Sequence, residues 1–73
     1  MIENEIVAKE ISDIILKTCE ALNETTIIAQ DRCPHEEFRT YRRAVAAVLA
    51  EINDQILNPL FSAHPKLEPS EPG

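Results

Sequence analysis

Apolar side chains recur at helical spacing along most of the chain, most regularly over residues 38–56. The spacings alternate between three and four, with two further apolar residues beside the series: Phe38, Tyr41, Val45, Val48 and Ile52, joined by Leu49 and Ile56. This alternation is typical of the apolar stripe of an amphipathic helix, because residues three and four apart lie on one side of a helix. We therefore predict a long helix here, and expect the other segments to be its packing partner, its connection and its tail.

Residues 2–29 predict another long helix, because neither Gly nor Pro interrupts them. One side carries the apolar stripe, which includes threonines: Val7, Ile11, Ile14, Ile15, Thr18, Leu22, Thr25 and Ala29. On the other side we expect the acid-before-base pairs Glu5–Lys9 and Asp13–Lys17. The β-branched run 25–28 also suits a strand, but no second strand is predicted to pair with it. Four apolar residues fall off this stripe: Ile2, Ile6, Leu16 and Ile27. They are either scattered exposed residues or a second contact surface for another chain.

The break between the two helices is predicted at Cys33-Pro34. Proline pushes the residue before it out of the helical region and suits the first position of a new helix. Cys33 is then expected to be the N-cap of a helix from Pro34 to about Leu57, with Glu36 completing a partial capping box. A connection of about four residues predicts two antiparallel neighbours, a helical hairpin.

The C-terminal part is predicted to hold a short turn and a tail. Asn58 is a suitable cap, and Pro59 opens a turn that extends to Ala63. The prolines that follow predict an extended polar segment. We therefore expect a helical hairpin domain over residues 1–63 and a Pro-rich C-terminal tail over residues 64–73. The PxxP spacing of Pro69 and Pro72 is a weak indication of peptide recognition.

Composition narrows the class of protein. The 73 residues are 44% hydrophobic, carry a net charge of −6 and include one glycine. Glycine-rich phosphate loops and dinucleotide-binding turns are therefore excluded. A chain this short usually needs a disulfide, a metal or another chain for support. The acidic start does not resemble a signal peptide, and no apolar run is long enough to span a bilayer. With two cysteines and no secretory signal, we expect a cytoplasmic protein without membrane contact.

One cluster, Asp31, Cys33 and His35, contains side chains that bind metals. Zinc sites usually combine two separated ligand pairs, and the second pair is missing here. Cys19 is expected about 20 Å from Cys33 along the first helix, which also excludes a disulfide between them. A nucleophilic cysteine needs an orienting group and a pocket, for which two helices leave little room. We therefore expect no metal, no cofactor and no enzymatic activity, and a structural role for Cys33.

Four of the seven basic residues gather within twelve positions: Arg32, Arg39, Arg42 and Arg43. They either pair with acidic side chains of the same or a neighbouring helix, or form an anion patch. The net charge of −6 and the scarcity of aromatic residues make a nucleic-acid partner unfavourable. The alternative function is nevertheless a small nucleic-acid-associated regulator that uses Arg39, Arg42 and Arg43.

These patterns predict an all-α fold, with two long antiparallel helices and a short C-terminal turn. Because two lone helices cover only part of stripes more than about 100° wide, we expect a second copy to complete a four-helix bundle with coiled-coil packing. The expected core and dimer interface comprises Val7, Ile11, Ile14, Ile15, Leu22, Phe38, Tyr41, Val45, Val48, Leu49, Ile52 and Ile56. The predicted function is a small non-enzymatic homodimeric structural or protein–protein interaction module, with room for a further protein partner. The pattern leaves open whether the two hairpins are parallel or antiparallel.

Overall fold

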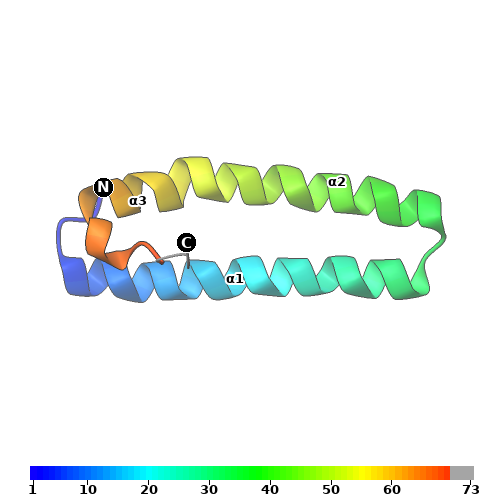
Figure 1. Cartoon of the computed structure of the whole chain (residues 1–73), viewed down its shortest axis with the longest axis horizontal. Coiled ribbons are helices and arrows are strands. Elements are labelled where there is room, and N and C mark those ends of the chain that lie inside the picture. Colours follow the sequence, from blue (N-terminus) through cyan, green and yellow to red (C-terminus); the bar gives the residue numbers. More distant parts are fainter. Residues whose placement is uncertain (70–73) are drawn as a thin grey trace.

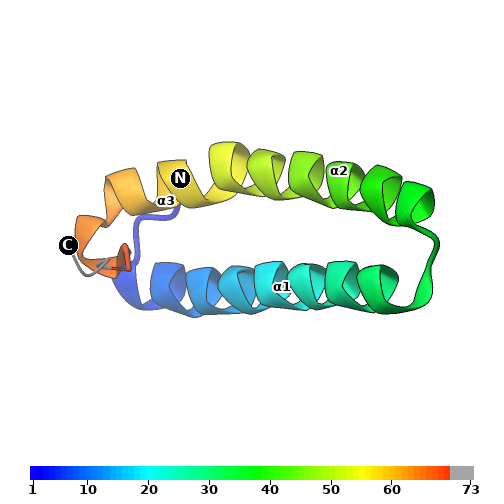
Figure 2. The same ribbon diagram turned by 45° about the vertical axis from the view of Figure 1, so that its right-hand side comes forward.

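A computed structural model describes residues 1–69 as two long antiparallel helices side by side, with shorter helical elements where the two ends of the chain meet (Figure 1). The helices are α1 (Glu5–Arg32), α2 (His35–Ile52) and α3 (Asn58–Ala63); a π-helix (Asn53–Leu57) joins α2 to α3, and a 3₁₀ turn (Pro65–Leu67) follows. A turned view keeps α1 and α2 beside each other along their whole length (Figure 2). Residues 1–69 contain no strand, so the predicted all-α helical hairpin is confirmed.

Asn4 starts α1. Its side-chain oxygen accepts a hydrogen bond from the backbone N–H of Val7 at 3.1 Å, which satisfies one of the donors left free in a first helical turn. The helix therefore begins three residues after the predicted Ile2. It also continues three residues beyond the predicted Ala29, to Arg32, so that the connection to α2 is only Cys33-Pro34.

The predicted N-cap role of Cys33 is wrong. Cys33 is the C-cap of α1, with an extended backbone, and its N–H donates to the carbonyl of Ala29 at 2.9 Å. Pro34 occupies the N-cap of α2, where no side chain makes a capping hydrogen bond, so the capping box with Glu36 does not form. The proline ring restricts only the residue directly before it, which allows α1 to continue until Cys33.

The inner face of α1 differs from the predicted stripe. Seven buried or half-buried residues follow one another at alternating spacings of four and three: Ala8, Ser12, Ile15, Cys19, Leu22, Thr26 and Ala29. At about 100° per residue, this inner face is rotated by about 60° from the centre of the predicted stripe. Half of the apolar stripe of α1 therefore packs on α2, and the other half remains on the surface.

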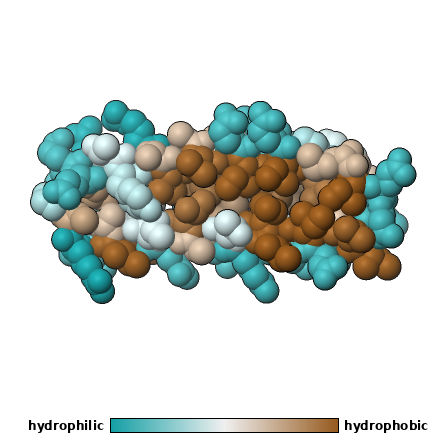
Figure 3. Space-filling view, turned by 180° about the vertical axis from the view of Figure 1, so that it is seen from behind, coloured by the Kyte–Doolittle hydropathy of each residue, from teal (hydrophilic) through white to brown (hydrophobic). Residues whose placement is uncertain are grey.

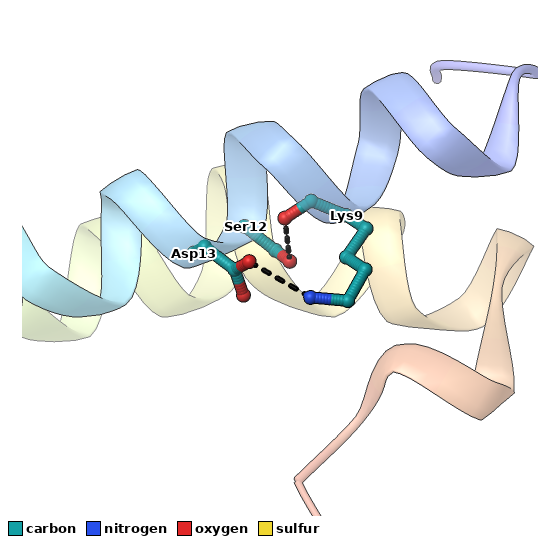
Figure 4. Close-up of polar contacts among 3 residues, drawn as sticks. All are labelled: Lys9, Ser12 and Asp13. Atoms are coloured by element: carbon teal, nitrogen blue, oxygen red, sulfur yellow. Dashed lines mark hydrogen bonds and ion pairs between the residues drawn. The ribbon is translucent and has the colours of Figure 1, made fainter.

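Ser12 is a buried polar residue of this inner face. Its hydroxyl donates to the backbone carbonyl of Lys9 at 3.0 Å, and the Lys9 ammonium lies 2.9 Å from Asp13 on the exposed side (Figure 4). The predicted ion pairs of Lys9 with Glu5 and of Asp13 with Lys17 are wrong, because Lys9 and Asp13 bind each other instead. Burial of the Ser12 hydroxyl is tolerated because its donor is satisfied within the helix.

The π-helix changes which residues point inward. Before it, Val45, Leu49 and Ile52 face α1 at spacings of four and three; after it the inner positions are Leu57, Leu60 and His64. The step of five from Ile52 to Leu57 reflects one extra residue in the turn, where the Asn58 N–H bonds the Asn53 carbonyl. Pro59 accounts for the wide turn, because it lacks an N–H and its ring would crowd a carbonyl in the preceding α-helical turn.

His64 ties the end of the helical region to the start of the chain. It is buried, and its Nε2 lies 2.6 Å from the backbone carbonyl oxygen of Ile2, 62 residues away in sequence. The prediction of extended chain from His64 onward is wrong for residues 65–67, which form the 3₁₀ turn. The PxxP segment extends into residues 70–73, which lie outside the described residues.

Candidate functional site

Five of the seven large exposed apolar residues of the two long helices lie on one flank of each, while Ile6 and Ile27 of α1 lie elsewhere. Val7, Ile14 and Ile28 lie seven and fourteen residues apart on α1, so they project from the same flank. Tyr41 and Val48 are seven apart on α2. These five side chains are between 39% and 61% exposed in the single hairpin.

A hydrogen bond shows that the two flanks belong to one side of the hairpin. The hydroxyl oxygens of Thr25 and Tyr41 lie 2.7 Å apart, and Thr25 also lies 2.6 Å from the Leu22 carbonyl. Because the single hydroxyl proton of Thr25 goes to that carbonyl, Tyr41 is the donor in the bond between the helices. We call this side the apolar face; it comprises Val7, Ile11, Ile14, Ile28, Tyr41 and Val48. Figure 3 shows it as a hydrophobic surface that extends over both helices.

The predicted core and interface residues divide into three groups. Val45 is buried inside the hairpin. Seven are half-buried: Ile11, Ile15, Leu22, Phe38, Leu49, Ile52 and Ile56. Val7, Ile14, Tyr41 and Val48 are exposed and lie on the apolar face. The predicted list therefore combines residues that hold the hairpin together with residues that the hairpin leaves uncovered.

The expected core list omitted most of the residues that are buried most deeply, namely Ala8, Ser12, Ala29, Leu57, Leu60 and His64, although Ala29 was placed on the predicted stripe of the first helix. The spacing of the first three residues indicates that they share one face of the helix, because they belong to the four-and-three series from Ala8 to Ala29. Their small or polar side chains do not stand out in a hydrophobic pattern. The other three depend on the register change at the π-helix.

A hollow of about 450 Å³ interrupts the apolar face near the connection between the helices. We call it the loop-end hollow; its lining residues are Thr25, Ile28, Ala29, Cys33, Glu37 and Tyr41. Both helices contribute to its wall, which includes the hydrogen-bonded residues Thr25 and Tyr41. The lining is mostly apolar, with the Glu37 carboxyl, the Cys33 thiol and the Tyr41 phenol as its ionisable groups.

Three arginines of the predicted patch lie on a different side of α2, whereas Arg32 is the last residue of α1 and does not line their hollow. Arg39, Arg42 and Arg43 line a second hollow of about 400 Å³, together with His35, Phe38 and Ala46. Among residues 1–69, their one ion pair joins Arg39 to Glu36 at 3.9 Å, with both side chains largely exposed. The expected pairing with acidic side chains is therefore confirmed for Arg39 alone in this part of the chain.

The metal-capable and nucleophilic candidates are not assembled into a centre. Cys19 is half-buried and Cys33 is exposed, and neither forms a disulfide. Within residues 1–69, no three His, Cys, Asp or Glu side chains converge on a point where a metal could bind. Over the same residues, no helix has both the length and the apolar character needed to cross a bilayer.

Comparisons with protein-family models, with curated proteins and with solved structures find no match to this chain.

Proposed function

We propose that the chain is a homodimeric helical module that packs its apolar face against the same face of a second copy. Five large apolar residues, exposed on one side of two packed helices, carry this proposal. A contiguous apolar surface of this kind usually marks a protein interface, whereas apolar residues scattered singly need no explanation. The completed assembly would be a four-helix bundle, the usual solution for two hairpins with apolar flanks.

The dimensions of the hairpin suit this role. Its principal extents are 45 Å by 23 Å by 23 Å, so one long side offers about 1,000 Å². A stable interface needs about 800 Å² from each partner. The hairpin alone fully buries few large side chains, since Ala8 and Ser12 are among its most buried residues. A second copy would add Val7, Ile14, Tyr41 and Val48 to the buried apolar surface.

A structural or interaction role is proposed in preference to catalysis. Cys33 and His35 stand at the connection between the helices, where both are exposed. Among the described residues, no hydrogen bond joins them to each other or to an orienting carboxylate. A catalytic cysteine needs a base held within hydrogen-bond reach. The exposed Cys33 thiol suits a reducing compartment such as the cytosol.

Light scattering on a sizing column at micromolar concentration tests the proposal. We expect a species of twice the chain mass of 8.2 kDa. Circular dichroism on the same samples, followed through dilution, reports whether helix content depends on association. A monodisperse single-chain species that stays fully helical on dilution would contradict the proposal.

A second candidate function rests on the arginines. Arg42 and Arg43 have no ion pair among residues 1–69, and they lie on the flank of α2 away from Tyr41 and Val48. In a dimer that covers the apolar face, these guanidinium groups would stay accessible to a phosphate backbone. Salt-dependent nucleic-acid binding that requires the arginines would favour this second function.

A further inference from the structure

We propose that the hollow lined by the arginines of α2 binds a small phosphate ester, with its phosphate between the guanidinium groups and its organic part against Phe38. We call it the arginine hollow; its lining residues are His35, Phe38, Arg39, Arg42, Arg43 and Ala46. The proposal goes beyond the homodimeric module and does not depend on it. The arginine hollow lies on the flank of α2 away from Tyr41 and Val48, so it stays open whether or not a second copy covers the apolar face.

Helical spacing gathers basic side chains on this flank. Arg39 lies four residues after His35, and the next two arginines follow Arg39 by three and four residues, so that all four share one side of α2. Like charges at these spacings repel each other, and an anion among them relieves the repulsion. Although the chain carries a net charge of −6, residues 38–50 include three arginines and no acidic residue. Positive charge is therefore concentrated around the arginine hollow and favours an anionic ligand.

The protein's own carboxylates compensate little of this charge. Among residues 1–69, Arg42 and Arg43 form no ion pair. The Arg39 guanidinium lies 3.9 Å from the Glu36 carboxyl, and both side chains are largely exposed, so the contact is weak and an incoming anion can replace it. Of the residues that the structure describes, no acidic one lines the arginine hollow, whereas Glu37 lines the loop-end hollow.

The neighbouring stretch of α1 is uncharged on the side of the arginine hollow. The hydrogen bond between Thr25 and Tyr41 places the end of α1 beside the start of α2 and marks the other side of the hairpin. On the flank of α1 opposite Thr25, Asn23 and Gln30 are exposed and uncharged. Glu24, the acidic residue between them, lies on the outward side of α1 instead.

The lining matches a phosphate joined to a small apolar group. A phosphate monoester presents about two negative charges and three acceptor oxygens. Guanidinium groups bind such oxygens in bidentate pairs. Half-buried Phe38 and Ala46 add apolar side chains to the same lining. The volume of about 400 Å³ lies within the range of about 300–1,000 Å³ typical of small-molecule sites, which leaves room for an organic group beyond the phosphate.

The charge distribution favours a small ligand over a nucleic acid. Exposed charges more than about 8 Å apart are largely screened at physiological ionic strength, so a single phosphate interacts mainly with the arginines around it. A nucleic-acid backbone would extend beyond the arginine hollow, along a chain whose net charge is −6. The arginine hollow therefore suits a phosphate ester of small-molecule size.

Amide NMR spectra of the full chain, recorded while phenyl phosphate is added in a phosphate-free buffer of low salt, test the proposal. We expect saturable shifts concentrated at residues 35–46. Inorganic phosphate should shift the same signals but bind at least about threefold more weakly, because it has no apolar group to cover Phe38. Absence of saturable shifts with phenyl phosphate would overturn the site, and equal Kd values for the two probes would overturn the choice of an ester.

Two matched pairs of variants separate a built site from diffuse attraction. Arg42→Gln and Arg32→Gln each remove one positive charge, but Arg32 does not line the arginine hollow. The Kd for phenyl phosphate should rise at least about tenfold in Arg42→Gln and less than about twofold in Arg32→Gln. Ala46→Glu should also weaken binding, by placing a carboxylate in the hollow, whereas Ala47→Glu adds the same charge at an exposed position outside it and should have little effect. Equal losses within either pair would overturn the site.

A single-stranded oligonucleotide is the last probe. If it binds more tightly than phenyl phosphate and loses affinity in Arg42→Gln, the small-ligand proposal is overturned in favour of the nucleic-acid function. The mass of the species in the same samples keeps this proposal apart from dimerisation. A single-chain species that binds phenyl phosphate would contradict the dimer and support the arginine hollow, whereas a dimer without binding would do the reverse.

Discussion

Ile14→Ala tests the apolar face directly. Ile14 is 61% exposed in the single hairpin and is no part of the inner series from Ala8 to Ala29. Alanine is a better helix former than isoleucine, so the change should leave α1 and its packing on α2 intact. Any loss of dimer affinity would then report on what covers Ile14.

The magnitude follows from the exposed fraction. Burying a whole isoleucine side chain contributes about 1.5–3 kcal/mol, so covering the 61% that remains exposed contributes about 1–2 kcal/mol in each copy. Because the residue occurs twice at a two-fold interface, Ile14→Ala should cost about 2–4 kcal/mol per dimer. At about 1.4 kcal/mol for each factor of ten, the dimer Kd should rise between about 30-fold and about 700-fold.

Ile27→Ala is the matched control. Ile27 is the same residue type on the same helix and is 56% exposed, but it lies with Leu16 on the flank away from the apolar face. Its truncation should leave the dimer Kd unchanged. Sedimentation equilibrium over a dilution series gives both constants. Equal Kd values for the wild type and Ile14→Ala, or equal losses in the two variants, would refute the assignment of the face.

Three further outcomes are expected. Val45→Asp should unfold the hairpin itself, because Val45 is buried between α1 and α2 and an unpaired charge there costs several kcal/mol. Helical circular dichroism should be lost at every protein concentration; retained helicity would show that this contact is dispensable. Asn4→Ala should lower the free energy of unfolding by about 1 kcal/mol in a urea titration, through loss of the cap on Val7, whereas Asn4→Ser should restore most of it. Nucleic acids should show no specific binding in an anisotropy titration at about 0.15 M salt, given the net charge of −6; micromolar affinity that is lost in Arg42→Ala and Arg43→Ala would reverse this expectation.

Local chemistry accounts for what sequence reasoning predicted correctly. Two long helices follow from uninterrupted periodic segments, and the break falls at Pro34 because proline excludes helical geometry in the residue before it. The same reasoning predicted a short turn from Pro59 to Ala63, where the structure has α3, but the predicted cap role of Asn58 is wrong, because Leu57 is the N-cap and Asn58 is the first residue of α3. It failed at Cys33, which is a C-cap of α1, because a residue before proline can end one helix as well as begin another.

The candidate site was only partly predictable. The predicted interface list contained every residue of the apolar face except Ile28, but it did not separate Val45, inside the hairpin, from Ile14, outside it. Periodicity shows that a helix has an apolar side, while the neighbouring helix selects the sector that it covers. Small side chains such as Ala8 and Ala29 allow close approach of two helices, and hydropathy does not mark them.

The sequence by itself determined the helices, their order and their sharp reversal, because these depend on residues close together in the chain. Only the tertiary structure decided the inner face of α1, the register change from Ile52 to Leu57, and the bond between His64 and the Ile2 carbonyl. Each of these depends on two segments packing against each other, and no local propensity encodes the distance or rotation at which they meet. The apolar face emerged for the same reason: it is the part of both stripes that remained uncovered once α1 and α2 had packed.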